Sequence, residues 1–164
     1  MYKRQSYKIV NTKELQEKGY LADLNIRVLL LKHDPITFDT YQDEIEYLIT
    51  HEKRNKFIRN LVWDLKGNTL ILYSRVATHG EVLYDIINKV ERKIFFVHGG
   101  VDVEERESVR RITEEENNAI IIASFGTFST GINIKNLHNV IFASPSKSRI
   151  LSLIHISEPT RLRR

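Results

Sequence analysis

The run Ala119-Ile120-Ile121-Ile122-Ala123, followed by Ser124-Phe125-Gly126-Thr127, is the stretch that decides the fold. Every position of the run is apolar, which predicts a strand buried on both of its faces. Strands of this kind occur in parallel sheets that helices cover on both sides. The small and hydroxyl residues that follow are typical of the loop or helix start at the carboxyl end of such a strand.

Further apolar runs occur along the chain on both sides of this one. We expect strands at residues 26–31, 69–73, 93–97, 119–123 and 140–143. Helical spacing of apolar residues predicts helices at 41–50, 52–66, 81–90 and 103–116, and places Phe57 and Trp63 in the core. The expected fold class is therefore α/β, a parallel sheet flanked by helices, with its ligand site at the carboxyl ends of the strands.

Composition excludes several classes of protein. The chain of 164 residues has no cysteine, so a disulfide framework and a thiolate zinc site are not expected. No apolar run reaches the length of a membrane span, and no acidic or histidine cluster has the spacing of metal ligands. The composition favours an intracellular, soluble protein without a membrane partner or a metal site of its own.

The two ends of the chain are predicted to be foreign to the domain. One coding of Tyr2-Lys3-Arg4-Gln5 has a reverse complement that encodes Leu-Ser-Leu-Ile, the run at Leu151–Ile154. A GTG start codon for Met1 extends the match to His155. Both ends resemble translated read-through of a sequencing adapter, so we expect residues 1–5 and 151–164 to be foreign.

Excluding the ends changes the charge of the chain. The full sequence has 25 basic and 21 acidic side chains, a formal net charge of +4. The ends hold five of the basic residues and one of the acidic residues, which leaves 20 of each in residues 6–150. The net charge therefore gives no argument for a nucleic-acid partner.

The predicted strand ends gather one kind of chemistry. Small, hydroxyl, glycine or basic residues follow four consecutive strands, at 74–80, 98–100, 124–131 and 144–149. Glycine lets the backbone approach a ligand closely, and hydroxyls with backbone N–H groups at helix starts bind phosphate oxygens. Arginine or lysine adds charge-assisted hydrogen bonds. The pattern favours a ligand that contains phosphate.

These segments resemble three motifs of the second RecA-like lobe of superfamily 2 helicases. The motif-like stretches are Leu70–Arg75, Val97–Gly100 with Glu105, Arg106 and Arg110, and Ile121–Ile134. The stretches Lys53–Lys56, His79-Gly80, Ala123–Gly126, Phe128–Gly131 and Val140–Ile150 are most similar to T4-type phage recombination and branch-migration helicases. The resemblance implies a division into residues 6–32, which connect from a missing first lobe and include a first strand, and residues 33–150, an incomplete RecA-like helicase C-terminal domain.

The resemblance also implies roles for individual residues. Ser124 and Thr127 are expected to hold phosphates of the tracked strand, and Ser74, Arg75, His98 and Gly99 to line the nucleic-acid groove. Gly131 and Asn133 are expected to face the nucleotide, although many relatives have aspartate where Asn133 stands. From the residues alone, His98 could equally cap a strand and Arg75 could be a solvated surface charge.

Three parts of a helicase motor are not found in the sequence. No G-x-x-x-x-G-K-[ST] loop and no DExH-like acidic motif occur, and both belong to the first lobe. The arginine finger of this class is expected shortly after Ile150, where the foreign tail begins. We therefore expect a fragment of an ATP-dependent DNA helicase in phage recombination, repair and fork or junction remodelling. The fragment itself is expected to be inactive as an ATPase and to contain no catalytic residue.

The resemblance implies partners for the complete protein: ATP with Mg²⁺, single-stranded or branched DNA, and the first lobe of the same chain. A phage-encoded helicase would work in the host cytoplasm. Two alternatives stay open at this point. One is a non-catalytic nucleic-acid-binding module, and the other is an unrelated doubly wound nucleotide-binding or transferase domain.

Overall fold

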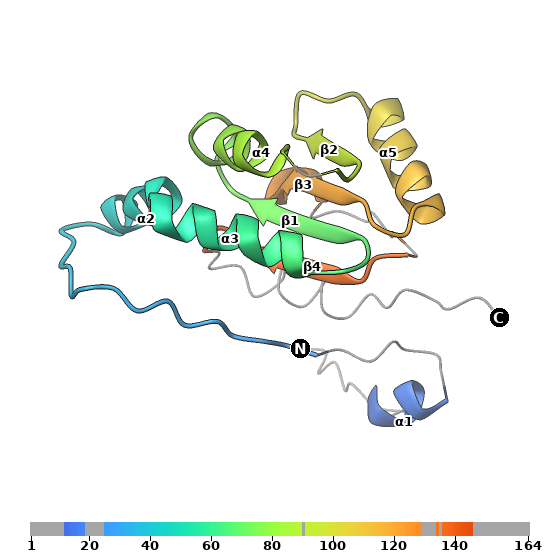
Figure 1. The fold of residues 1–164 in the computed structure, drawn as a ribbon, viewed down its shortest axis with the longest axis horizontal. Helices are drawn as coiled ribbons and strands as arrows, with labels where there is room; N and C mark the ends of the chain where they lie inside the picture. The colour runs from blue at the N-terminus through green and yellow to red at the C-terminus, as the bar shows by residue number, and fades with distance from the viewer. Residues whose placement is uncertain (1–11, 19–24, 90, 129–133, 135, 146–164) are drawn as a thin grey trace, which may run out of the picture.

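A four-stranded sheet forms the centre of the structure (Figure 1). The structure, a computed structural model, describes residues 12–18, 25–89, 91–128, 134 and 136–145. The strands are β1 (Thr69–Tyr73), β2 (Ile94–Val97), β3 (Ile120–Ser124) and β4 (Asn139–Phe142), in the spatial order β2-β3-β1-β4. All three strand pairings are parallel, which confirms the predicted sheet.

Helices connect and precede these strands. They are α1 (Thr12–Glu17), α2 (Tyr41–Thr50), α3 (Glu52–Asp64), α4 (Glu81–Ile87), α5 (Val103–Glu115) and α6 (Phe125–Phe128), and a π-helical turn, η1 (Val76–Gly80), precedes α4. Helix α2 begins with a capping box in which Thr40 and Asp43 bond each other's backbone amides. His51 caps α3 by accepting the N–H of Arg54 at 3.1 Å.

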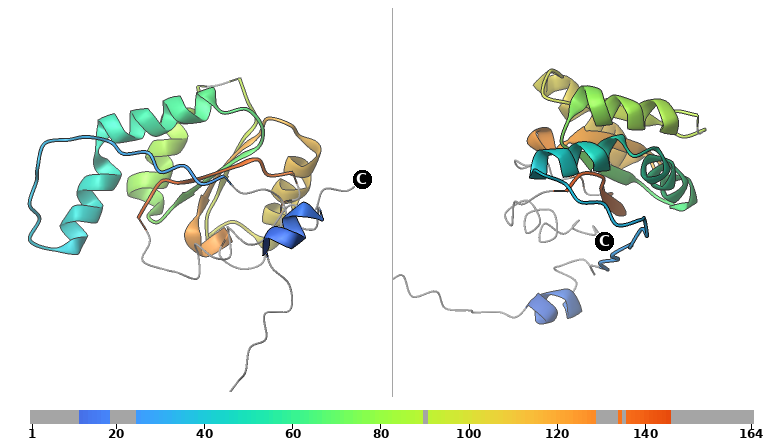
Figure 2. Two further views of the ribbon diagram at one scale, coloured as in Figure 1. Left: turned by 90° about the horizontal axis from the view of Figure 1, so that it is seen from below. Right: turned by 90° about the vertical axis from the view of Figure 1, so that its left-hand side faces the viewer.

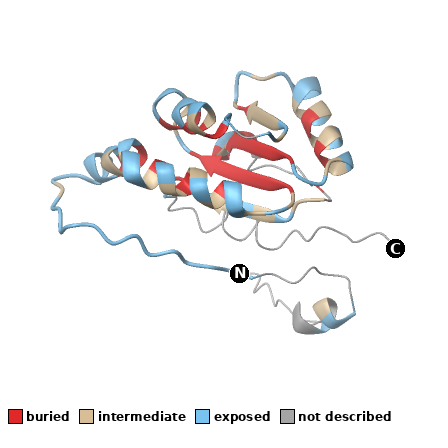
Figure 3. Ribbon diagram, viewed as in Figure 1, coloured by how far each residue is buried: buried red, intermediate tan, exposed pale blue. Residues whose placement is uncertain are grey.

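Each face of the sheet packs against its own helices (Figures 1 and 2). On one face, Ile71 and Tyr73 of β1 contact a cluster that includes residues of α3 and α4. On the other face, Leu70 and Leu72 contact a cluster that includes Val109 of α5. All five residues of β1 are buried, because successive side chains point to opposite faces and helices cover both (Figure 3). This two-sided burial explains the apolar runs of the central strands β1 and β3, whereas the outer strands β2 and β4 are only partly buried.

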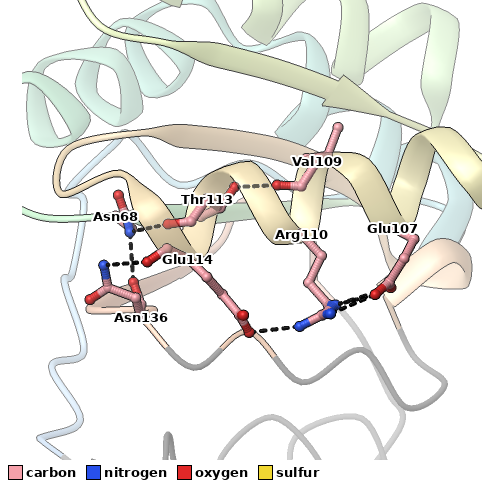
Figure 4. Close-up of polar contacts among 7 residues, drawn as sticks. All are labelled: Asn68, Glu107, Val109, Arg110, Thr113, Glu114 and Asn136. Atoms are coloured by element: carbon pink, nitrogen blue, oxygen red, sulfur yellow. Dashed lines mark hydrogen bonds and ion pairs between the residues drawn. The ribbon is translucent and has the colours of Figure 1, made fainter.

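The start of the sheet is held together by one buried side chain, Asn68. Its Nδ2 lies 2.6–2.8 Å from the carbonyl oxygens of Thr113, Glu116 and Asn136, which share its two hydrogens. Its Oδ1 accepts the N–H of Ala119 at 2.8 Å. Asn68 thus connects the start of β1 to the end of α5, the start of β3 and the segment before β4. Figure 4 shows its bonds to Thr113 and Asn136. Within helix α5, Arg110 forms ion pairs with Glu107 and Glu114.

Two sequence-based predictions are wrong. Residues 26–31 are not a strand: they run without secondary structure, pair with no described strand, and are exposed (Figure 3). An apolar run shows a need for burial but does not specify a hydrogen-bonding partner, and a strand requires one. Trp63 is 43% exposed, because it lies on the outer side of α3, where Arg59 stacks over its ring.

Candidate nucleic-acid interface

The carboxyl ends of the strands meet at one edge of the sheet, as predicted. Tyr73 pairs with Ser124, Val97 pairs with Ala123, and Leu72 pairs with Phe142. The residues at the strand ends or just after them therefore follow one another along this edge in the order His98, Ser124, Ser74 and Ser144. We call this line of residues the strand-end edge.

Ser124 and Thr127 lie together at the end of β3. Their hydroxyl oxygens are 2.6 Å apart, because β3 passes directly into α6 and a separation of three residues brings both side chains to the first turn. Thr127 is only 4% exposed, whereas Ser124 is half-buried. The structure therefore leaves Ser124 as the more accessible hydroxyl, with Thr127 behind it as its partner.

Arg75 follows β1 and is held by helix α2. Its Nη2 donates to Oε1 of Gln42 at 3.1 Å, and its Nη1 lies 3.7 Å from Oε2 of Glu46. Helix α2 lies on the side toward which the β1 arrow points (Figure 1). An ion pair this long between partly exposed side chains contributes little to stability, so a phosphate could replace the carboxylate. Arg75 is thus a cation beside the edge rather than a freely solvated charge.

His98 and Gly99 form the turn after β2. His98 Nδ1 accepts the N–H of Gly100 at 3.1 Å, and its ring lies 5.5 Å from that of Phe96. The turn therefore uses one nitrogen of His98, and the neutral ring keeps its hydrogen on the other. Gly99 is exposed, and a Cβ atom added there would meet nothing within 4 Å. Packing does not require glycine at this position, and the space beside it is open.

His79 is bonded to Ser144 of the strand-end edge, and the predicted set of site residues included neither of them. Both are buried, and His79 Nδ1 lies 2.9 Å from Ser144 Oγ. Burial lowers the pKa of His79 to about 4, with a smaller contribution from the charge of Arg54. A lone histidine says little in a sequence, and the π-helical turn that directs His79 inward has no sequence signature.

Arg54 of α3 reaches the same region. It donates from Nη1 to the carbonyl of Leu48 at 3.2 Å and from Nη2 to the carbonyl of Ala143 at 2.5 Å. Desolvation lowers the pKa of its guanidinium. Arg54 therefore connects the α2–α3 junction to the end of β4.

The other predicted site residues, Gly131 and Asn133, lie outside the described residues, as do the predicted foreign ends and the boundary at Ile150. Within the part of the chain that the structure describes, no group of three His, Cys, Asp or Glu side chains could hold a metal ion. None of the described helices is long and apolar enough to cross a membrane.

The described edge presents hydroxyls, an open glycine turn and an arginine, a set that suits a phosphodiester backbone. The family of the Helicase conserved C-terminal domain matches residues 52–158, which include all four strands and the strand-end edge. The chain belongs to this family. Membership removes the alternative of an unrelated nucleotide-binding or transferase domain.

The sequence and the crystal structure of one phage relative agree with this assignment. The chain is 36% identical over 163 residues to the ATP-dependent DNA helicase uvsW of Enterobacteria phage T4, in an alignment that covers 94% of this chain and 32% of the relative. The crystal structure of T4 UvsW matches with a TM-score of 0.61 and 37% identity, over 71% of this chain and 24% of that one. The chain thus spans about a third of the length of the curated relative.

Proposed function

We propose that this chain is the C-terminal lobe of an ATP-dependent DNA helicase and that its strand-end edge binds the sugar–phosphate backbone of DNA. The observation that carries the proposal is the parallel register, because it gathers residues from separate motifs along one edge. The name of the phage relative supports DNA as the nucleic acid and ATP as the fuel. A role in phage recombination, repair and junction remodelling belongs to the same proposal.

Within this proposal the predicted residues take different parts. Ser74, Arg75 and Ser124 contact the backbone, and the open turn at Gly99 lets a phosphate approach the main chain. Thr127 supports Ser124 rather than binding directly, because its hydroxyl is buried against that of Ser124. His98 shapes the turn. The proposed nucleotide contacts, Gly131 and Asn133, complete an ATP site with Mg²⁺ only when the first lobe faces them.

Removing the charge of Arg75 tests the DNA-binding edge. Binding of the chain to a fluorescent single-stranded oligonucleotide is measured by anisotropy over a range of salt concentrations. Arg75→Ala should weaken binding and reduce the slope of log affinity against log salt by about 0.7 to 1, the change expected when one fewer phosphate is neutralised. Glu46→Gln should strengthen binding, because it removes the carboxylate that competes for Arg75.

Lys93→Ala is the matched control for charge. Lys93 directly precedes β2 at the opposite edge of the sheet, where it pairs with Glu116. This variant also removes one positive charge, so any general effect of net charge appears in it equally. Equal losses of affinity and slope in the Arg75 and Lys93 variants would place the DNA contact elsewhere on the molecule.

A further inference from the structure

The hydrogen-bond ladder between β1 and β4 ends at the strand-end edge. The last ladder bond runs from the N–H of Ala143 to the carbonyl of Leu72, at 2.8 Å. Pro145 follows Ser144 and has no N–H, so it cannot donate to β1. In a regular parallel ladder the carbonyl of Ala143 would next accept the N–H of Ser74. That carbonyl instead accepts from Arg54.

Ser144 takes over as the acceptor for Ser74. The Ser144 hydroxyl oxygen lies 3.1 Å from the backbone nitrogen of Ser74 and accepts its N–H. The same oxygen lies 2.9 Å from His79 Nδ1, and both side chains are buried. With His79 neutral, the hydroxyl can accept from Ser74 and donate its own hydrogen to Nδ1. His79 then fixes the direction of the hydroxyl.

The turn η1 brings His79 to this position. A π-helical turn spans Val76–Gly80, with the N–H of Gly80 bonded to the carbonyl of Arg75 at 3.0 Å. Such turns are rare and recur at functional sites. Here the turn begins directly after Ser74 and Arg75, and it places the side chain of His79 against Ser144. The segment after β1 is therefore bonded to Ser144 twice: by the N–H of Ser74 at its start and by Nδ1 of His79 near its end.

We propose that His79 and Ser144 are positioning residues for DNA binding, because their hydrogen-bonded pair holds the backbone of Ser74 and so sets the place of the Ser74 hydroxyl and of Arg75. The inference rests on the proposed function of the strand-end edge. Neither residue touches the DNA. Each acts through the backbone N–H of Ser74, the first residue after β1.

The first test measures the Ser74 amide directly by hydrogen exchange and ¹⁵N NMR on the whole chain. Ser144→Ala and His79→Leu should each speed exchange of this amide by roughly tenfold relative to wild type, the effect of losing about one hydrogen bond. His79→Asn should retain most of the protection, because the Asn side-chain oxygen can replace Nδ1 as an acceptor. Unchanged exchange in Ser144→Ala would overturn the proposal.

The second test measures oligonucleotide affinity in the same variants. Ser144→Ala and His79→Leu should bind roughly three- to tenfold more weakly, and the double variant no more weakly than the weaker single variant. His79→Asn should bind nearly as wild type does. Val109→Ala is the matched control, because it removes buried volume on the opposite face of the sheet without touching the edge.

The two tests separate the two proposals. Losses of affinity no larger than that of Val109→Ala, or losses that multiply in the double variant, would overturn the positioning role. If wild type binds no oligonucleotide, the proposed function fails. The exchange of the Ser74 amide then still decides whether the His79–Ser144 pair holds the end of β1.

Discussion

At the scale of single residues, His79 has an unusual set of contacts. Nδ1 is bonded to Ser144, whereas Nε2 is buried and has no hydrogen-bond partner among the described residues. Besides burial, the positive charge of Arg54 lowers the pKa of His79. A proton on this imidazole would therefore add a positive charge in a buried place beside another, so the neutral form is strongly preferred.

This preference predicts how stability depends on pH. The pKa of His79 is about 4 in the folded chain against an ordinary value of 6.5, so its contribution is fully present above about pH 6.5 and is lost as pH falls through 4. In urea unfolding, wild type should lose about 2 kcal/mol of unfolding free energy relative to His79→Asn between about pH 7 and pH 5. A difference independent of pH would show that His79 does not titrate as inferred.

At the scale of elements, the turn η1 depends on Gly80. A Cβ atom at this position would lie 2.5 Å from both Cε2 and Cζ of Tyr73. Tyr73 cannot move aside easily, because it is fully buried and its ring stacks on Phe96 at 5.8 Å. The start of α4 therefore lies directly on a tyrosine ring, and only glycine fits there.

We predict that Gly80→Ala lowers the free energy of unfolding by about 2–3 kcal/mol, the cost of overpacking a rigid contact. Alanine is otherwise the better helix former, so propensity alone predicts the opposite sign. Gly99→Ala is the control, since a Cβ atom there meets no neighbour within 4 Å, and its effect should stay within about 0.5 kcal/mol. Urea unfolding of the three proteins measures both effects.

The elements also show what the sequence could and could not predict. The bounds of strands β1 to β4 were predicted to within a residue. Burial on both faces explains the apolar runs of the central strands β1 and β3, whereas the outer strands β2 and β4 carry apolar residues although they are only partly buried. The apolar run at residues 26–31 gave the same signal without a partner strand, so the same reasoning was wrong there. The gathering of Ser74, His98 and Ser124 followed from parallel topology. The link from His79 to Ser144 did not, because it depends on a local π-helical turn and on contacts between residues 65 apart in the chain.

At the scale of the whole molecule, the two edges of the sheet have different tasks. The strand-end edge gathers the candidate DNA contacts. The opposite edge is held by Asn68, whose side chain bonds the backbone of α5, of the residue just before β3 and of the segment before β4. Figure 4 shows the bonds to α5 and to the segment before β4. Because these bonds join elements far apart in the sequence, their loss should affect global stability rather than the site.

Asn68→Ala tests this separation. The variant removes the donors to three carbonyls and the acceptor for the N–H of Ala119, in a place without exposure to water, so we expect unfolding free energy to fall by about 2–4 kcal/mol. Affinity for the oligonucleotide should stay as in wild type at temperatures where the variant is folded. Asn60→Ala, at an exposed asparagine of α3, is the control and should change stability by no more than about 0.5 kcal/mol. A loss of affinity in folded Asn68→Ala, comparable to that in Arg75→Ala, would mean that the two edges are coupled through the sheet, because Asn68 lies at the starts of strands whose opposite ends form the candidate site.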